Sequence, residues 1–266
     1  MLAIMKESAG DVLGINAGAK VSGVGSTNRV TIVTLIPGYP LLTLSQDQPR
    51  RSLEMITISA FNNVPDFAKG LVRDMRVRWA LEEAGLPYTT RLLTQGDQDK
   101  PDYRALQPFG QVPILEEDGL VLFESGAIVL HLGERSETLL PKDPVARIRA
   151  VQWLIAALNS IEPAVWNLFL IDFIFPNEEW AKLRRPSAVE FMNRRLDALA
   201  KRLGDKPFLD GEHFTAGDLM MAAVLGFHRE ARKRDPRLAA YIDRCTARPA
   251  HKRALDAQLG DFRMAA

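Results

Sequence analysis

The chain has 266 residues, 47% of them hydrophobic and 25% charged, with a formal net charge of +1. These values fit a globular protein of one large or two modest domains and leave no large field that would attract nucleic acid or an acidic membrane. A single cysteine excludes an intrachain disulfide framework; with no apparent secretory signal or bilayer-spanning apolar stretch, a cytoplasmic protein without nucleic-acid or membrane partners is predicted.

Residues 1–54 differ in texture from the rest of the chain. They are rich in glycine, and the apolar stretch from Val30 to Leu44 is broken by prolines and shows no helical period. A short strand around Thr31–Leu35 is the one element this segment indicates. We expect a poorly structured extension. A sharper hypothesis is that Met55 is the true start and that the first 54 residues are an annotation artefact.

Regular patterns begin at Met55. Apolar and polar residues alternate over Ile56–Ala60, which predicts a strand, and apolar residues recur at helical spacing over Val77–Ala84. Gly85, followed by a proline, is a typical helix end. Tyr88–Leu93 is then predicted as a second strand.

A hairpin and a helix complete this first half. Asp118-Gly119 lies between two short apolar runs and favours the positive φ angles of a tight hairpin turn. A helix is predicted from Ser125 to about Glu134. The resulting order, strand, helix, strand, connection, hairpin, helix, describes a compact α/β domain over residues 55–137.

The remainder, residues 142–266, is predicted to be all-helical, after a linker near Glu137–Asp143. A helix opens at Pro144 and runs through Leu158, and others are expected near Val189–Leu203, Ala216–Arg234 and Pro236–Cys245. Thr215 and Asp218 have the spacing of a capping box at the start of the third of these. Its role would be in folding.

Two charge patterns are explained most simply by solvent-facing sides of helices. Arg78 and Glu82 are one helical turn apart and are expected to pair on the outer side of their helix. The run Phe227–Arg234 is basic. A solvated helix face explains it best, and a phosphate-binding patch is the alternative.

Two short motifs could bind a ligand. Val112-Pro113 precedes a strand, and a cis bond there would turn the amide and carbonyl of Val112 outward, where they could pair with an extended peptide. Glu124-Ser125 lies where the hairpin meets a helix. Ser125 could donate to a carboxylate at the helix N-terminus while Glu124 holds an ammonium group. The alternative is an ordinary serine N-cap.

Four segments together resemble the glutathione transferase family. Met75–Tyr88 is similar to the first helix and second strand of that family, Pro108–Leu115 to its cis-proline segment, and Leu122–Ile128 to its Glu-Ser motif. Phe214–Leu219 resembles its helix-capping signature. The order and spacing of these segments match the family, and the resemblance covers nearly all of residues 55–260.

The resemblance implies a thioredoxin-like α/β N-terminal domain, an all-α C-terminal domain, glutathione as cosubstrate and a homodimer. It places the backbone of Val112, held by cis Pro113, against the cysteinyl part of glutathione. It places Glu124 and Ser125 at the γ-glutamyl end. It places Gln111 near the tripeptide backbone or its glycine carboxylate.

The loop after the first strand departs from the family pattern. Relatives carry Ser, Tyr or Cys there, but no hydroxyl or thiol occurs between Ala60 and Leu71. Asn63, and after it Asn62, are the candidates for a donor to the glutathione sulfur. The alternatives are that both merely form the loop or that backbone amides act instead. Without a cysteine here, a glutaredoxin-like redox mechanism is not expected.

The predicted function is conjugation of the glutathione thiolate to small, mostly apolar electrophiles, with Phe67 and Trp166 as candidates for the electrophile pocket. A glutathione-dependent isomerase, dehalogenase or peroxidase, or a non-catalytic glutathione-binding module, would use the same site. No metal is expected, because the four histidines show no ligand spacing.

Overall fold

The computed structural model describes residues 31–33, 43–45 and 55–264, and the chain divides into two units, Met1–Glu54 and Met55–Ala266. In the first unit, β1 (Thr31–Val33) and β2 (Thr43–Ser45) pair in an antiparallel manner. Strand β1 falls in the segment where a short strand was expected. The rest of the predicted extension, and the hypothesis of a later start, lie outside the described residues.

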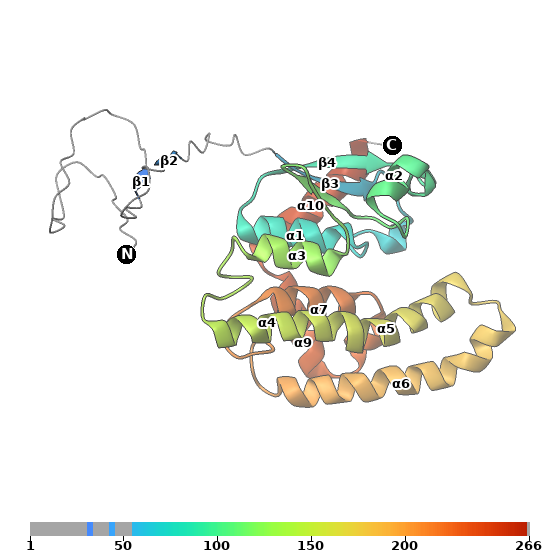
Figure 1. Ribbon diagram of the computed structural model, residues 1–266. Coiled ribbons are helices and arrows are strands. Elements are labelled where there is room, and N and C mark those ends of the chain that lie inside the picture. The colour runs from blue at the N-terminus through green and yellow to red at the C-terminus, as the bar shows by residue number, and fades with distance from the viewer. Residues whose placement is uncertain (1–30, 34–42, 46–54, 265–266) are drawn as a thin grey trace, which may run out of the picture. The chain divides into compact units, whose positions relative to one another are not determined.

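The second unit begins with a four-stranded sheet of order β4-β3-β5-β6 (Figure 1). Strand β3 is parallel to β4 and antiparallel to β5, and β5 is antiparallel to β6. This mixed sheet, with the helices between its strands, is the thioredoxin-like arrangement expected from the sequence. Its elements are β3 (Ile56–Phe61), η1 (Asp66–Ala68), α1 (Asp74–Ala84), β4 (Tyr88–Leu93), η2 (Asp97–Asp99), α2 (Pro101–Leu106), β5 (Leu115–Glu117), β6 (Leu120–Leu122) and α3 (Ser125–Gly133).

Local chemistry sets the ends of several of these elements. Gly85 ends α1 with φ 66°, and its amide donates to the carbonyl of Leu81. Asp118 and Gly119 take φ 50° and 79° in the turn between β5 and β6. Both sites need positive φ, which glycine adopts without strain and aspartate tolerates better than most residues. The predicted helix end and hairpin are therefore confirmed.

The second half of this unit is helical, as expected, although its helix limits differ from the predicted ones. The elements are α4 (Pro144–Ala156), the π-helical turns η3 (Ala157–Ile161) and η4 (Leu170–Ile174) on either side of α5 (Glu162–Phe169), α6 (Glu179–Leu203), α7 (Ala216–Gly226), α8 (Arg229–Lys233), α9 (Pro236–Thr246) and α10 (Pro249–Met264).

Two predicted helices have the wrong limits. Helix α6 starts at Glu179, ten residues before the expected Val189, and continues through Pro186. Its first turns are exposed and show little apolar periodicity, so the sequence pattern does not predict them. The helix expected over Ala216–Arg234 breaks at His228, whose ring nitrogen Nδ1 accepts the amide of Glu230 at 3.2 Å and caps α8.

The run from Pro144 to Ile174 is one continuous helical stretch of 31 residues. It contains an 18-residue window of mean hydropathy 1.5, so the expectation that no apolar stretch reaches spanning length is wrong by length and composition. In the structure 44% of that window is buried. A core helix of a soluble protein passes the same test, and this run packs against α6 and α7.

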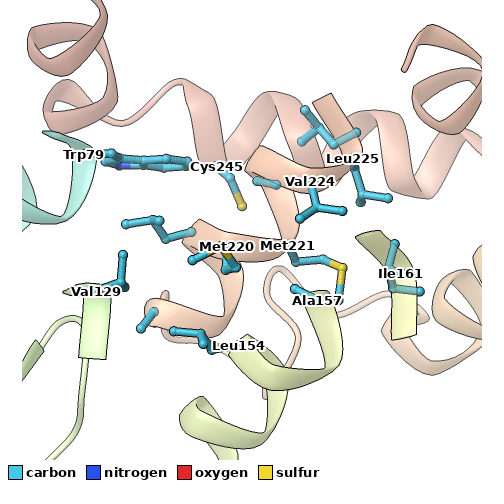
Figure 2. Close-up of a cluster of buried hydrophobic side chains, with 14 of the residues drawn as sticks. Trp79, Val129, Leu154, Ala157, Ile161, Met220, Met221, Val224, Leu225 and Cys245 are labelled. Atoms are coloured by element: carbon cyan, nitrogen blue, oxygen red, sulfur yellow. The ribbon is translucent and has the colours of Figure 1, made fainter. Parts of the chain in front are cut away.

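The main hydrophobic core surrounds α7. Figure 2 shows Met220, Met221 and Val224 of α7 among apolar side chains of α1, α3, α4 and α9. Cys245 is fully buried there, and burial raises the pKa of its thiol. A buried neutral thiol is a poor nucleophile, so Cys245 acts as a small apolar residue.

Close packing of α4 on α7 requires a glycine at position 217. A Cβ there would lie 2.5 Å from Cβ of Trp153 and 3.1 Å from the carbonyl oxygen of Ala150. Gly217→Ala is therefore expected to lower the free energy of unfolding by about 2 kcal/mol, the typical cost of overpacking a core. Urea unfolding followed by circular dichroism measures it.

Gly260 in α10 is the matched control. The only heavy atom near a Cβ built there is Nη2 of Arg263, at 3.9 Å. Gly260→Ala should then stabilise the protein slightly, by about 0.5–1 kcal/mol, since alanine favours a helix over glycine. Equal effects of the two substitutions would refute the packing role of Gly217.

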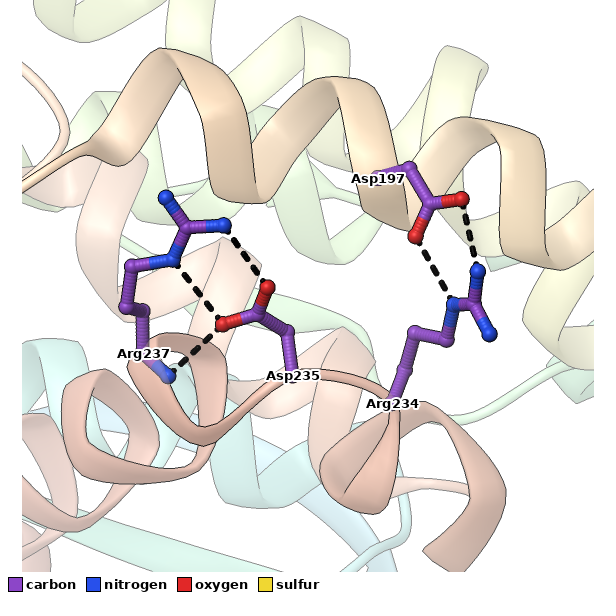
Figure 3. A network of polar contacts seen from close by, with 4 residues as sticks. All are labelled: Asp197, Arg234, Asp235 and Arg237. Carbon is purple, nitrogen blue, oxygen red and sulfur yellow. Dashed lines mark hydrogen bonds and ion pairs between the residues drawn. The ribbon is translucent and has the colours of Figure 1, made fainter.

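Residues of the basic run Phe227–Arg234 form ion pairs. Arg232 pairs with Asp243, and the guanidinium of Arg234 binds both carboxylate oxygens of Asp197 on α6, at 2.7 and 2.8 Å (Figure 3). Next to it, Asp235 accepts from the amide and guanidinium of Arg237, which lowers the pKa of its carboxyl to about 2. These exposed contacts favour the solvated-face interpretation over a phosphate patch.

Candidate functional site

A cavity of about 300 Å³ opens between the two halves of the second unit. One wall comes from the end of β3, the loop after it and the first residue of α1. A second wall is the segment just before Pro113, and a third belongs to the helical half. The lining residues are Phe61, Ala68, Leu71, Val72, Arg73, Asp74, Gln98, Gly110, Gln111, Val112, Trp166, Phe169 and Phe227.

The Val112–Pro113 peptide bond is cis, as the resemblance implied. Two hydroxyls hold this segment against β3. The hydroxyl of Tyr103 donates to the carbonyl of Gln111 at 2.9 Å, and the amide of Ile114 donates to Oγ of Ser59 at 2.8 Å. Val112 lines the cavity from this fixed segment.

These contacts also account for the protons of both hydroxyls. A hydroxyl has a single proton to donate. Tyr103 gives its proton to Gln111, so Ser59 must donate in the 2.9 Å contact between the two hydroxyls. Ser59 is fully buried. The hydroxyl nearest to the loop is therefore structural and has no proton left for a ligand.

Glu124 and Ser125 stand at the start of α3. Glu124 is exposed and has φ 70°, ψ 112°, a conformation that non-glycine residues rarely adopt. Strain of this kind concentrates at binding sites. Ser125 is the first helical residue, and its side chain forms no cap. Its Oγ accepts instead from Nη1 of Arg76 at 3.3 Å. The ordinary N-cap interpretation of Ser125 is therefore wrong.

Arg76 belongs to a buried charge cluster that joins the two halves. It is 1% exposed and donates to Glu162 of α5 from both terminal guanidinium nitrogens, Nη2 at 2.7 Å and Nη1 at 3.3 Å. Arg73 also contacts Glu162, at 3.2 Å. Burial opposes the charge on Glu162, but the two guanidinium groups hold its pKa below the ordinary value. Arg73 and Arg76 thus share the carboxylate of Glu162, and the charge of Glu124 also acts on Arg76.

The loop after β3 is anchored by the C-terminal helix. The amide of Gly70 donates to Oε1 of the fully buried Gln258 at 2.8 Å, and Nε2 of Gln258 donates to Asp74 at 2.9 Å. Asp74 also accepts from Arg78 at 2.9 Å. The loop and the first turn of α1 are therefore fixed by α10, and Asp74 both takes part in these contacts and lines the cavity.

Aromatic rings form the apolar wall. Trp166 stacks on Phe169 with ring centroids 5.1 Å apart, and Phe169 stacks on Phe173 at the same distance. Phe67, half exposed, stacks on Phe173 at 5.9 Å. Trp166 and Phe169 line the cavity with Phe227, and this apolar wall suits an apolar or aromatic partner.

The structure places three of the sequence-predicted residues in the cavity lining, whereas Pro113, Glu124, Ser125 and Phe67 are not part of that lining. Gln111, Val112 and Trp166 line the cavity. Asn62 and Asn63 instead line a different depression, with Thr94 and Gln95. The side-chain amide of Asn62 donates to Oγ1 of Thr94 at 3.2 Å.

Arg73, Arg76 and Glu162 were missed in the sequence. The contact between Arg76 and Glu162 spans 86 positions. The one local signal was two arginines at i, i+3 spacing at the start of a helix, where the macrodipole disfavours cations.

A metal centre has no support: among the described residues, no group of three or more His, Cys, Asp or Glu side chains could hold an ion.

Two protein domain families match the chain. The glutathione S-transferase N-terminal domain matches residues 75–135, and the glutathione S-transferase C-terminal domain matches residues 192–244. The first match runs from α1 through the cis-proline segment to α3, and the second runs from the middle of α6 into α9. A thioredoxin-like domain followed by an all-helical domain defines the glutathione transferase fold.

Individual relatives agree with these matches. Disulfide-bond oxidoreductase YfcG of Escherichia coli is 30% identical over 202 residues, which are 69% of this chain and 90% of the relative. Glutathione S-transferase F14 of Arabidopsis thaliana is 31% identical over 161 residues, 54% of this chain, and the match spans only 63% of the relative.

A solved glutathione transferase from Burkholderia graminis, with two glutathione molecules bound per subunit, has a TM-score of 0.67 and 27% identity. The match covers 77% of this chain and 88% of that one. The chain therefore belongs to the glutathione S-transferase family, as the four sequence segments indicated.

Proposed function

We propose that this protein binds glutathione in the cavity beside Val112 and transfers its thiolate to small, mostly apolar electrophiles. The observation that carries the proposal is the meeting, in one cavity, of the cis-proline segment, the first turn of α1 and the aromatic wall of the helical half. The first two would hold the peptide, and the third would hold the second substrate.

Glutathione would lie along the edge that the sequence predicted. The backbone of Val112 would pair with the cysteinyl residue, which puts the sulfur in the cavity. Ser125, at the N-terminus of α3, would bind the γ-glutamyl carboxylate while Glu124 holds its ammonium group. Gln111, exposed next to Val112, would reach the glycine end. We also propose that the protein is cytoplasmic and forms a homodimer.

The chemistry requires the sulfur as a thiolate. A free thiol has a pKa of about 8.5, and lowering it by two units needs about 2.7 kcal/mol. The first turn of α1 borders the cavity, but the end of a helix contributes about 0.3–1 kcal/mol at exposed sites and about 2 kcal/mol at best. A second group is needed to make the thiolate the main form at neutral pH.

The relative YfcG is named a disulfide-bond oxidoreductase, which keeps a reductase reaction as the second candidate. In such a reaction the bound thiolate would attack a disulfide sulfur in place of a carbon electrophile. Because the cavity lining contains no cysteine, glutathione would supply the attacking sulfur in both reactions. The two candidates therefore share the binding site and differ only in the second substrate.

Two measurements test the proposed function. Calorimetry measures glutathione binding, and a panel of an aryl halide, an organic peroxide and a small disulfide separates the reactions. We expect binding and turnover of the aryl halide. Binding with turnover of the disulfide alone would favour the reductase, and binding without any turnover would favour a non-catalytic module.

Ser125→Ala is expected to weaken glutathione binding about tenfold, which corresponds to the loss of one charge-assisted hydrogen bond of about 1.4 kcal/mol. Cysteinylglycine lacks the γ-glutamyl residue, so its affinity should not change. Ser187→Ala, on the exposed face of α6, is the matched control. Equal losses for both peptides would show that Ser125 does not contact the γ-glutamyl end.

A further inference from the structure

The cavity lining contains no hydroxyl or thiol group. Its side chains with polar groups are Arg73, Asp74, Gln98, Gln111 and Trp166, and only Arg73 is a cation. Ser59 and Tyr103 lie nearby, but each already gives its proton to another group. Asn62 and Asn63 line a separate depression. The donors that relatives place beside the sulfur are thus absent from the lining, and a cation is present.

Arg73 is held in place on two sides. Its guanidinium carbon lies 4.9 Å from the ring centroid of Trp166, and its Nη2 lies 3.2 Å from Oε1 of Glu162. The side chain is 30% exposed, so it is partly shielded yet accessible from the cavity. A guanidinium has five N–H donors in one plane, and the contact with Glu162 uses one nitrogen.

The charge of Arg73 is only partly neutralised. Glu162 makes its shorter contact, 2.7 Å, with Arg76, which is itself nearly fully buried. Glu162 thus serves two guanidinium groups, and the charge of Glu124 also acts on Arg76. Asp74 is the remaining charged residue of the lining, but it is 3% exposed and bonded to Arg78 and Gln258. The charge of Asp74 is thus paired with the guanidinium of Arg78.

We propose that Arg73 is the catalytic residue that stabilises the glutathione thiolate, by donating from its guanidinium to the sulfur in the cavity beside Val112. The aromatic ring of Trp166 and the carboxylate of Glu162 position it, and the first turn of α1 adds its own positive potential. The inference deepens the proposed transferase function and rests on glutathione binding in this cavity.

The direct test is the pKa of the bound thiol, followed by ultraviolet difference absorbance of the glutathione complex as pH is varied. Arg73→Met is expected to raise this pKa by one unit or more and to lower kcat/KM at pH 7 about tenfold. The rate at high pH should recover, because the thiolate then forms without help. Arg73→Lys keeps the charge and should retain most of the shift.

A second readout separates a sulfur contact from general damage to the site. S-methylglutathione has no ionisable thiol, so its affinity should be nearly the same in the wild type and in Arg73→Met, whereas glutathione binds more weakly to the variant at pH 7. Asn63→Ala should leave both affinities and the thiol pKa unchanged.

The possible outcomes are distinct. An unchanged thiol pKa in Arg73→Met, or a shift in Asn63→Ala instead, overturns the role of Arg73 while glutathione binding stands. Parallel losses of affinity for both peptides also overturn it, because they indicate a structural role. If Arg73→Met does not fold, a raised pKa in Arg73→Gln supports the proposal and an unchanged one refutes it. A wild type that binds no glutathione overturns the proposed function itself.

Discussion

Replacing Asp218 by alanine is expected to lower the free energy of unfolding by about 4 kcal/mol. Its fully buried carboxylate accepts four hydrogen bonds: one each from the amides of Leu209 and Thr215, and from the hydroxyls of Thr215 and Tyr241. The substitution would leave several buried donors without partners, at about 1–3 kcal/mol each, and would remove the capping box of α7. Because the neighbouring residues can relax and recover part of this cost, we expect a total loss of about 4 kcal/mol.

Denaturant unfolding measures this loss, and Asp235→Ala is a suitable control. Asp235 caps α9 near the surface: its side chain is 18% exposed, and it accepts from the amide and side chain of Arg237, which is 47% exposed. Loss of such a cap costs about 1 kcal/mol. If Asp218→Ala costs no more than Asp235→Ala, the buried network around Asp218 does not contribute as described.

Glu162→Gln is expected to destabilise the protein by about 3–5 kcal/mol, because it removes the counter-charge of the buried Arg76. The same substitution should loosen the contact between α1 and α5. Glu190→Gln is the control: Glu190 pairs with Arg194 on an exposed face of α6, and such pairs contribute about 0.3–0.5 kcal/mol. Similar losses from both substitutions would contradict the role given to Glu162.

The stabilisation by Glu162 should depend on pH with a definite sign. The folded protein holds the pKa of Glu162 below its ordinary value of 4.5. A carboxyl with a lowered native pKa stabilises the fold fully above its unfolded pKa and loses that contribution as pH falls through the native pKa. The difference in stability between wild type and Glu162→Gln should therefore be constant near neutrality and shrink below about pH 4.5.

Sequence patterns predicted those features that depend on neighbouring residues. The Asp118-Gly119 turn, the end of α1 at Gly85 and the capping box of Thr215 and Asp218 each follow from the chemistry of a few adjacent residues. The cis bond before Pro113 came from the family resemblance. The fold class followed from the order of such elements.

Features that depend on distant partners could not be predicted. Arg78 was expected to pair with Glu82 on an outer face, yet it is buried and bonded to Asp74 and, at 2.5 Å, to Asp261, which lies 183 positions further on. Glu82 pairs instead with Arg253 of α10. The C-terminal helix covers this side of α1, and periodicity alone does not reveal which face a later helix will cover.

The candidate site shows the same division. Val112, Ser125 and Gln111 were found because they belong to contiguous motifs, whereas the Arg73–Glu162 contact joins residues 89 positions apart. Asn63 was favoured because the loop contains no hydroxyl or thiol and an asparagine side chain can donate a hydrogen bond. The folded loop lies against α10 through Gly70, and its later residues, Leu71 to Asp74, border the cavity in place of the asparagines.

A crystal structure of the protein with glutathione bound would test the central claim most directly. We expect the cysteinyl backbone on Val112, the γ-glutamyl carboxylate at Ser125 and the sulfur in the cavity within hydrogen-bond distance of the Arg73 guanidinium. Glutathione bound outside this cavity would contradict the proposed function. Glutathione on Val112 with its sulfur directed to Asn63 would leave that function in place and contradict the role of Arg73.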